Sequence, residues 1–395
     1  MGVRKKKVFG RIITAVLGLT ILLSLIPVDV NTAQAATLPS DVSKPSSGCV
    51  FIAMDGEYVS GAKAAVKRIN EIRYEACKQG VKMNGRKLTL KDYVPIKWSA
   101  GLEKIARIRA AESSITMYHQ RLNGKSVFSF KYPGSGWVTS EVIAWNWSDE
   151  MTPAIEQWYR EKRDYVSGKP GAVTGHYTSM IDPNNRYIGM ATFISKTAPY
   201  RNTTVAQFMS GGSQSEKVAK ATGKCSAKIE ASMKEITALK ISGKKTIDRA
   251  QSASFALRAV LGNYGTASYK VLSNVKWTSS NPSVAKVSST GVVTGLKKGT
   301  AKITAKLGSK STTYTVSVTV KAIKSVNLSK TSYKYDGKAK TPSVVVKDSD
   351  GKTVSAKYYK ITYPKSRSKV GTYKVVITFS GRYSGSVTRT FKIVK

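Results

Sequence analysis

Residues 175–191 read GHYTSMIDPNNRYIGMA, a short polar and aromatic stretch that leads into an apolar, strand-like run. The stretch contains His176, one of only two histidines in a chain of 395 residues with 65 lysines and arginines. The other is His119, 57 positions earlier in the sequence ITMYHQR. Two imidazoles in so basic a chain either form one site or are unrelated, and the surrounding sequence bears on that choice.

Three segments around these histidines repeat apolar residues at spacings of three and four, which is typical of amphipathic helices. They are residues 60–79, 98–120 and 152–166. Ser99 is the predicted N-cap of the second helix, which runs on to His119, and Thr152 that of the third. Together with the strand-like run at 186–194, these helices predict an α+β domain.

Beyond residue 235 the apolar period becomes two, as in TAKITAKL at 300–307. Gly, Ser, Thr and Asn separate such runs, which is typical of small antiparallel sandwiches. ITALKIS at 236–242 and IKSVNLS at 323–329 match in spacing, at an offset of 87 residues. The sequence therefore predicts two immunoglobulin-sized modules in tandem.

The charge of the chain is extreme, with a formal net value of +42. Residues 236–320 hold 13 basic residues and one acidic residue, and residues 321–395 hold 18 and three. So basic a protein repels itself unless an anionic surface is near. DNA, RNA, acidic lipid and anionic cell-wall polymers are the partners that charge alone allows.

The first 35 residues have the organisation of a secretory signal peptide. A basic start, MGVRKKKVFGR, precedes an apolar run of about 16 residues, too short for a comfortable membrane span. AQAA then predicts cleavage after Ala35. We therefore expect a secreted protein, with no transmembrane segment after cleavage and with nucleic acid excluded as the physiological partner.

The three cysteines leave two interpretations open. Cys49 and Cys225 bracket the first domain, so a disulfide between them would tie its ends together, while Cys77 stays unpaired. The alternative, which we favour, is three buried or idle thiols. Cys49 lies well beyond Ala35 and is not placed as a lipid-attachment cysteine.

Residues 58–195 resemble the CAP superfamily of SCP-like, pathogenesis-related-type extracellular domains. The resemblance rests on INEIRYEA, SEVIAW, WYREKRDY and above all on Gly175-His176-Tyr177-Thr178 followed by Tyr187-Ile188-Gly189. It implies an α-β-α sandwich and a tetrad of two His and two acidic residues in a central cleft. Carried over, the tetrad is His119, Glu141, Glu161 and His176. Val142 stands where the family's usual Gly-Glu-Asn motif has Asn.

A helical wheel supports the assignment of Glu161, which falls at the edge of the apolar face of the segment 152–166 and so can reach into a cleft. Two neutral imidazoles can coordinate a divalent ion such as zinc, which would bind weakly because zinc sites usually have three protein ligands or more. Binding should then weaken below about pH 6, since only the neutral ring is a ligand. The competing interpretation is a His/Glu network that fixes the fold without chemistry.

Residues 236–395 resemble bacterial Ig-like modules. VKWTSSNPSVAKVSSTGVVTGLKKGTAKITA at 275–305 is similar to the group 2 domains, with Trp277 as a core anchor. The remainder is similar to repeat-type Ig-like modules of secreted bacterial proteins. Neither module has a His, Cys or paired-acid constellation, so we expect them to act either as spacers or as a wall-binding part that works by charge.

The predicted organisation is thus α+β followed by two all-β Ig-like sandwiches. Its parts are, from the N-terminus, signal peptide 1–35, linker 36–57, CAP domain 58–200, linker 201–235, group 2 Ig-like domain 236–320 and second Ig-like module 321–395. We expect a secreted protein, non-covalently associated with the cell wall, that binds a ligand in the cleft of His119, Glu141, Glu161 and His176, or a divalent metal through His119 and His176. Its expected partners are anionic cell-wall polymers or a host or surface ligand. The alternative is a metal-assisted hydrolase of peptide or wall material, with Glu141 or Glu161 as base.

Overall fold

The computed structural model describes residues 36–38, 40–212, 214–220, 223–262 and 264–395. The predicted signal peptide, residues 1–35, lies outside the described residues. Within the described part, no helix is both long and apolar enough to cross a bilayer.

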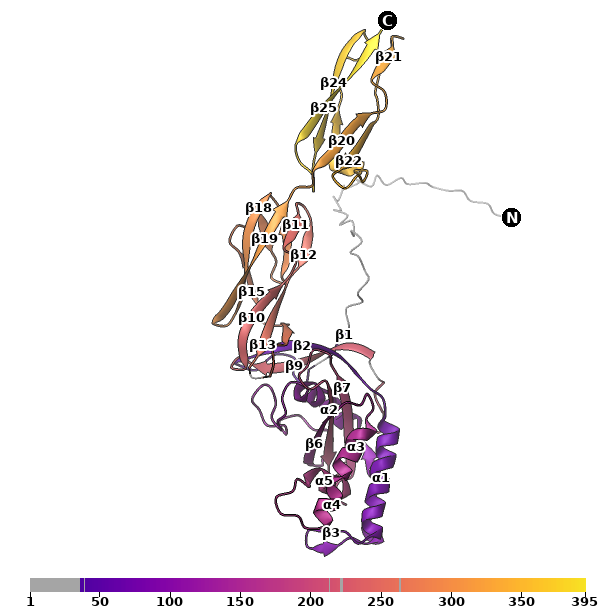
Figure 1. The fold of residues 1–395 in the computed structure, drawn as a ribbon, viewed down its shortest axis with the longest axis vertical. Helices are drawn as coiled ribbons and strands as arrows, with labels where there is room; N and C mark the ends of the chain where they lie inside the picture. The colour runs from indigo at the N-terminus through magenta and orange to yellow at the C-terminus, as the bar shows by residue number, and fades with distance from the viewer. Residues whose placement is uncertain (1–35, 39, 213, 221–222, 263) are drawn as a thin grey trace, which may run out of the picture. The chain divides into compact units, whose positions relative to one another are not determined.

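A mixed sheet forms the centre of the N-terminal part (Figure 1), and its strands follow the order β2-β7-β8-β6, with β5 parallel to β7 and β9 antiparallel to β2. The edge strand β6 pairs with β8 alone, which places Glu141 opposite Gln207. The bounds of these strands are β2 Cys49–Tyr58, β5 Lys97–Trp98, β6 Val138–Asn146, β7 Tyr187–Ile194, β8 Asn202–Met209 and β9 Gly223–Ser232.

Helices cover both faces of this sheet because its strands are apolar on both sides. On β7, Ile188 and Met190 belong to the core under α1, α3 and α5, whereas Ala191 and Phe193 belong to the core that includes α2. Figure 1 shows α1, α3, α4 and α5 close together. The helix bounds are α1 Ala62–Lys78, α2 Ala100–Ser113, α3 Thr152–Tyr159, α4 Glu161–Val166 and α5 Gly175–Ile181.

Gly189 on β7 is required by the close approach of α2. A Cβ atom at this position would lie 2.1 Å from the backbone nitrogen of Glu103 and 2.2 Å from the carbonyl carbon of Leu102. Such contacts are far inside van der Waals distance, so a side chain here would push the helix off the sheet. The glycine of the YIG motif therefore allows α2 to pack closely on β7.

Two stretches expected to be linkers carry strands instead, so that expectation is wrong for most of their length. Residues 36–57 contain most of β2, and residues 201–235 contain β8 and β9. Every residue of β8 is buried. The NTTVAQFM stretch is rich in β-branched and apolar residues, a composition that favours a strand over a linker.

A disulfide between Cys49 and Cys225 is excluded by the register of two strands. Cys49 lies opposite Ser232, and Cys225 lies opposite Gly56, seven positions further along β2. At about 3.3 Å per residue the two cysteines are far beyond the ~7 Å Cα separation that a disulfide tolerates. All three cysteines are buried.

In the described residues of 236–395, the regular elements are strands and one short 3-10 turn at Ala356–Tyr358. Residues 236–319 and 323–394 each contain a four-stranded sheet, with the orders β11-β19-β18-β15 and β21-β25-β24-β23. In both, the first strand is parallel to its neighbour and the others are antiparallel. The strands of these sheets are β11 Thr246–Asp248, β15 Lys276–Ser279, β18 Gly299–Leu307, β19 Lys310–Thr319, β21 Ser332–Lys334, β23 Tyr359–Thr362, β24 Gly371–Phe379 and β25 Ser386–Val394.

The other strands of this part pair in smaller groups. Strand β17 pairs with β12 and with β16, and β20 pairs with β22. Strands β10, β13 and β14 extend the N-terminal sheet. They join it through β14, which pairs with β2 at Lys270–Ala53 and Val271–Ile52. These strands are β10 Ile236–Ser242, β12 Ser252–Ser254, β13 Ala256–Leu261, β14 Ser268–Val271, β16 Ala285–Val287, β17 Val292–Gly295, β20 Ile323–Leu328 and β22 Val344–Asp348.

Candidate functional site

His119 lies in the loop after α2 and does not close that helix as expected. The helix ends at Ser113, and the hydroxyl of Ser114 donates to the carbonyl of Ala111 at 2.8 Å. Serine side chains that bond the backbone in this way compete with helix continuation. The imidazole is 52% exposed, and its Nδ1 lies 3.0 Å from Oε1 of Glu141.

Glu141 is buried on β6 and both of its oxygens are engaged. Arg109 donates from Nε to Oε2 at 2.8 Å and from Nη2 to Oε1 at 3.1 Å, and Gln207 donates to Oε2 at 2.5 Å. Burial alone would raise the pKa of this carboxyl, but the hydrogen bond from His119 and the charge of Arg109 hold it below its ordinary value. Glu141 is therefore an ionised group that orients His119.

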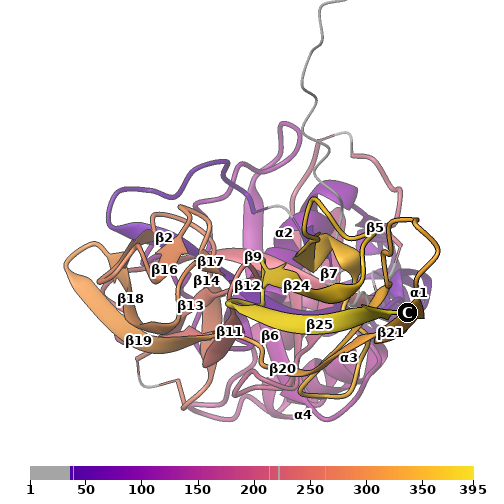
Figure 2. The ribbon, with the colours of Figure 1, turned by 90° about the horizontal axis from the view of Figure 1, so that it is seen from above.

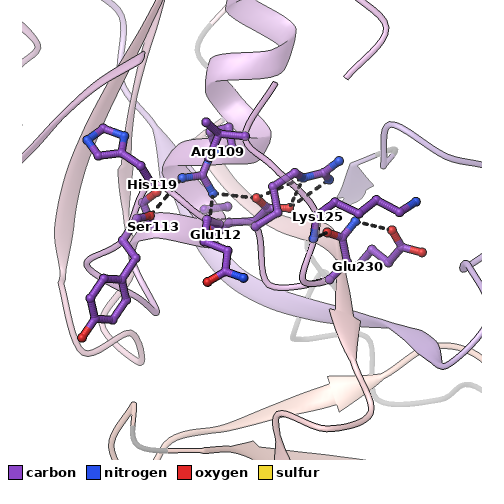
Figure 3. Close-up of polar contacts among 12 residues, drawn as sticks. Arg109, Glu112, Ser113, His119, Lys125 and Glu230 are labelled. Atoms are coloured by element: carbon purple, nitrogen blue, oxygen red, sulfur yellow. Dashed lines mark hydrogen bonds and ion pairs between the residues drawn. The ribbon is translucent and has the colours of Figure 1, made fainter. Parts of the chain in front are cut away.

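Glu141 is part of a longer buried chain of alternating charges. Arg109 also donates to Glu112 at 2.7 Å. Arg121 forms ion pairs with both Glu112, at 3.0 Å, and Asp41, at 2.8 Å. Figure 3 shows Arg109 and Glu112 joined in this way beside the His119 loop. The side chains of Arg109 and Glu112 are completely inaccessible to solvent. Burial of so many charges is tolerable only because each has a partner.

The second pair, His176 and Glu161, is built on backbone amides. Glu161 begins α4 after a break at Arg160 that divides the helix predicted over 152–166. Its Oε2 accepts from the backbone N–H groups of His176 and Tyr177 at 3.1 Å each, in the first turn of α5. Its Oε1 lies 2.5 Å from Nδ1 of His176. As the wheel indicated, Glu161 is at an edge, with 15% of its side chain exposed.

The ring of His176 is held from a second side by Trp158 of α3. The two rings are nearly parallel, with 12° between their planes and 6.2 Å between their centroids. Trp158 is itself buried and donates to the carbonyl of Ile143 on β6 at 3.2 Å. His176, with 23% of its side chain exposed, is thus fixed more firmly than His119.

The strand β6 separates the surroundings of the two pairs. Ile143, on the same side of the strand as Glu141, packs in the core with α2, while Val142 packs in the core with α1, α3 and α5. Among the described residues, no hydrogen bond or ion pair joins one pair directly to the other. Because Val142 faces away from Glu141, the departure from Gly-Glu-Asn leaves the contacts of that carboxyl intact, and Gln207 supplies an amide to it.

The donor set around the histidines is small for a metal site. In the described ranges, no cluster of three or more His, Cys, Asp or Glu side chains is arranged to hold an ion. Each His contributes one ring nitrogen to its glutamate, so a ligand could take only the Nε2 atoms. Carboxylate-oriented imidazole is the usual form of a metal-ligating histidine.

An open pocket of about 1040 Å³ lies between the end of α1 and α4, and its lining includes none of the four predicted residues. Val81, Tyr159 and Tyr165 line it, with Lys82 and Arg160 among its basic residues. It shares helix α4 with Glu161 but does not include that side chain.

Sequence reasoning missed Arg109, Glu112 and Gln207. Arg109 carried a usable signal, because it lies three and four positions after Ala106 and Ile105 on the apolar stripe of its helix. A guanidinium on a buried stripe requires buried carboxylates. Gln207, in contrast, is brought to Glu141 by the pairing of β6 with β8, which local sequence does not encode.

Comparison with known families confirms the resemblance noted in the sequence. The model of the Cysteine-rich secretory protein family (CAP) matches residues 66–208, and that of the Bacterial Ig-like domain matches residues 273–322. The chain contains a CAP domain followed by a bacterial Ig-like domain. Glu141, Glu161 and both histidines lie inside the CAP match.

Solved structures with detectable similarity include domains 4 and 5 of the S-layer protein SbsC, at 20% identity over 41% of this chain and 100% of that one, with a TM-score of 0.23. Domains 1–6 of the same S-layer protein match at 18% identity over 52% of this chain and 35% of that one, with a TM-score of 0.24. An outer surface protein from Borrelia burgdorferi matches at 16% identity, covering 39% of this chain and 97% of that one, with a TM-score of 0.27.

Proposed function

We propose that this protein is a secreted cell-surface protein whose CAP domain binds a small ligand or divalent ion at its two His–Glu pairs. The observation that carries the proposal is the contact of each ring's Nδ1 with a carboxylate. Each Nδ1 faces a carboxylate, at 3.0 Å for His119 and 2.5 Å for His176, so each ring offers Nε2 to a ligand. Orientation of this kind is what a binding imidazole needs.

The finer fold assignment belongs to the same proposal. Helices on both faces of the N-terminal sheet support an α-β-α sandwich, in which β6 is the edge strand. The shared strand order of the two four-stranded sheets supports an Ig-like sandwich in each half of the C-terminal part, including residues 321–395, which lie almost entirely beyond the Ig-like match.

For a metal, the fit is limited to two protein ligands. His119 and His176 would hold the ion through Nε2, and zinc bound by two imidazoles would keep open coordination positions. An ion would supply Lewis-acid polarisation of a bound ligand. Two ligands give weaker affinity than the three of usual catalytic sites, so we expect binding that chelators and competing ligands remove readily.

The second candidate is a metal-assisted hydrolase of peptide or wall material. Glu141 is poorly suited as its base, because Arg109, Gln207 and His119 occupy both carboxylate oxygens. Glu161 likewise accepts from two backbone amides and from His176. An acid–base step in this site would therefore use an imidazole Nε2, with the glutamate as its orienting partner.

The C-terminal modules would hold the protein at the envelope without a covalent link. They carry 31 of the basic residues against four acidic ones in residues 236–395. Attraction of this kind is screened by salt, and at 0.5 M the Debye length is only about 4–5 Å. We expect the protein to bind Gram-positive walls at low salt and to be released by about 0.5 M salt.

The test of the site uses the whole mature chain, because β14 pairs with β2 and a cut at residue 235 would remove that strand. Zinc is titrated calorimetrically into the wild type and into His119→Ala, His176→Ala and the double variant, with Glu150→Ala as an exposed control. We expect both single variants to lose binding and the double variant to be no worse.

Binding that survives in both single variants would overturn the metal proposal. Variants that unfold, together with a wild type that takes up no zinc, would assign the four residues to the stability of the fold alone. Release of amine or reducing ends from wall material by the wild type, lost in His119→Ala, would favour the hydrolase over the binding protein.

A further inference from the structure

The two four-stranded sheets of the C-terminal part each present an outer face rich in lysine, threonine and serine. In the first sheet, the register places Lys306 opposite Ser311, Lys302 opposite Thr315 and Thr304 opposite Thr313. The alternate residues, such as Ile303 and Val316, are buried in the core. The hydroxyl and ammonium groups therefore share one surface.

A like-charged pair lies on this face. Lys276 of β15 is directly opposite Lys306 of β18, and both are exposed. Like charges in this position destabilise a sheet. Within the described residues, neither lysine has an ion pair, and the one acidic residue of 236–320, Asp248, lies on β11 and pairs with Arg382 at 2.8 Å. Nothing in the sheet itself offsets the repulsion.

The second sheet repeats the pattern. Lys374 lies opposite Thr390, Lys360 opposite Thr378 and Lys392 opposite Thr372, with inward neighbours such as Val375 and Phe391 in the core. GTAK at 299–302 on β18 and GTYK at 371–374 on β24 begin equivalent strands. Figure 2 shows the two hairpins, β18–β19 and β24–β25.

Protection of sheet edges does not explain the lysines on the interior strands of the two sheets. Charges that prevent edge-to-edge pairing are placed on edge strands. Here Lys302, Lys306 and Lys374 are on β18 and β24, which have a partner strand on both sides. Lysines on the interior strands are free to contact a partner that lies across the face.

We propose that these two Lys/Thr/Ser faces bind a linear polyanion whose charges are phosphate groups along its backbone and which carries no bases. Ammonium groups neutralise phosphate, and hydroxyls donate to its remaining oxygens. Lys302 and Lys306 are four residues apart, about 13 Å along the strand, which suits a repeating charge. The strands place no aromatic ring on these faces, so stacking of nucleobases is not provided for.

The proposal rests on attachment by charge as proposed above and names the surface and the partner chemistry. The whole mature chain is titrated with long-chain inorganic polyphosphate in about 0.1 M NaCl, where the Debye length is about 10 Å. The first variant replaces Lys276, Lys302 and Lys306 with Thr, and the second replaces Lys360, Lys374 and Lys392 with Thr. The matched control makes the same change at Lys286, Lys297 and Lys298, three exposed lysines outside the four-stranded sheet of the first module.

We expect each face variant to bind polyphosphate about tenfold more weakly and with a shallower dependence on salt, and the control to change by less than about threefold. Equal losses in the face and control variants would overturn the assignment to the faces while leaving attachment by net charge intact. If the wild type does not bind polyphosphate, both the assignment to the faces and attachment by net charge are overturned. If single-stranded RNA of equal charge binds more tightly than polyphosphate, the proposal that the ligand carries no bases is overturned.

Thermal melts separate binding from stability. Relief of the Lys276–Lys306 repulsion should leave the first face variant at least as stable as the wild type. A face variant that melts lower and binds weakly would count against the proposal, because its lysines would then serve the fold.

Discussion

The two His–Glu pairs of the CAP domain use the same hydrogen bond with opposite supports. Glu141 is fixed by side-chain charge, through Arg109 and a buried chain that ends at Asp41. Glu161 is fixed by two backbone amides of α5. An ionic support fails when one partner is lost, because a bare charge stays buried, whereas amides cannot be removed by a side-chain substitution.

The largest effect should come from Arg109→Met. This change leaves Glu141 and Glu112 buried without their shared cation, and the removal of one partner from a buried ion pair costs about 3–5 kcal/mol. Urea unfolding of residues 36–395 measures the loss. Adding Glu112→Gln and Glu141→Gln to the same chain should restore part of it, and a loss below ~1 kcal/mol in Arg109→Met would contradict the ionic support.

The next effect is a loss of stability in acid. Against the effect of burial, His119 and Arg109 lower the pKa of Glu141 in the fold, so this carboxyl stabilises the protein above its ordinary value of 4.5. That contribution is lost as the pH falls from about 4.5 through the lowered value. Burial opposes ionisation of Asp41 as well, but Arg121 lowers the pKa of that carboxyl and adds to the same trend.

Unfolding free energies from about pH 7 down to about pH 2.5 test this sign. The wild type should lose stability more steeply below pH 4.5 than Glu141→Gln, which has no charge to lose at that position. The surface variant Glu150→Gln serves as the control. A Glu141→Gln curve parallel to the wild type would show that the ionic chain does not depend on this carboxylate.

The smallest effect separates the two imidazoles. His176→Ala removes a ring stacked on Trp158, and such aromatic pairs contribute about 0.5–1.5 kcal/mol. His119→Ala removes a half-exposed ring and leaves Glu141 with Arg109 and Gln207, so we expect a change within about 0.5 kcal/mol. Thermal melts compare them, and a larger cost for His119→Ala would reverse the order of the two supports.

The sequence identified the four residues of the site but not the residues that hold them in place. The SEVIAW, WYRE and GHYT motifs identified Glu141, Glu161 and His176, and His119 was placed at the end of the second predicted helix. The structure joins each His to one Glu. The end of α2 was placed too late, because the apolar rhythm continues past Ser113 while the serines there turn the backbone. The convergence of all four residues on one cleft stays a prediction.

The strands between the motifs were the main omission. Residues 201–235 look like a polar connection because serine, threonine and lysine are frequent, but β8 and β9 are buried between neighbours on both sides. Burial of threonines such as Thr203 and Thr204 is offset by hydrogen bonds to Tyr200 and Thr192, which no local pattern predicts.

The sequence by itself determined the α+β to all-β change near residue 235, the family motifs and the charge of the C-terminal modules, since periodicity and composition are local properties. Tertiary structure decided what lies across a sheet. It placed Gln207 opposite Glu141 and Lys276 opposite Lys306. It also separated Cys49 from Cys225 by seven positions in the pairing of β2 with β9. The reason is physical: strand register joins residues distant along the chain, and it is fixed by the packing of whole faces, which no single segment encodes.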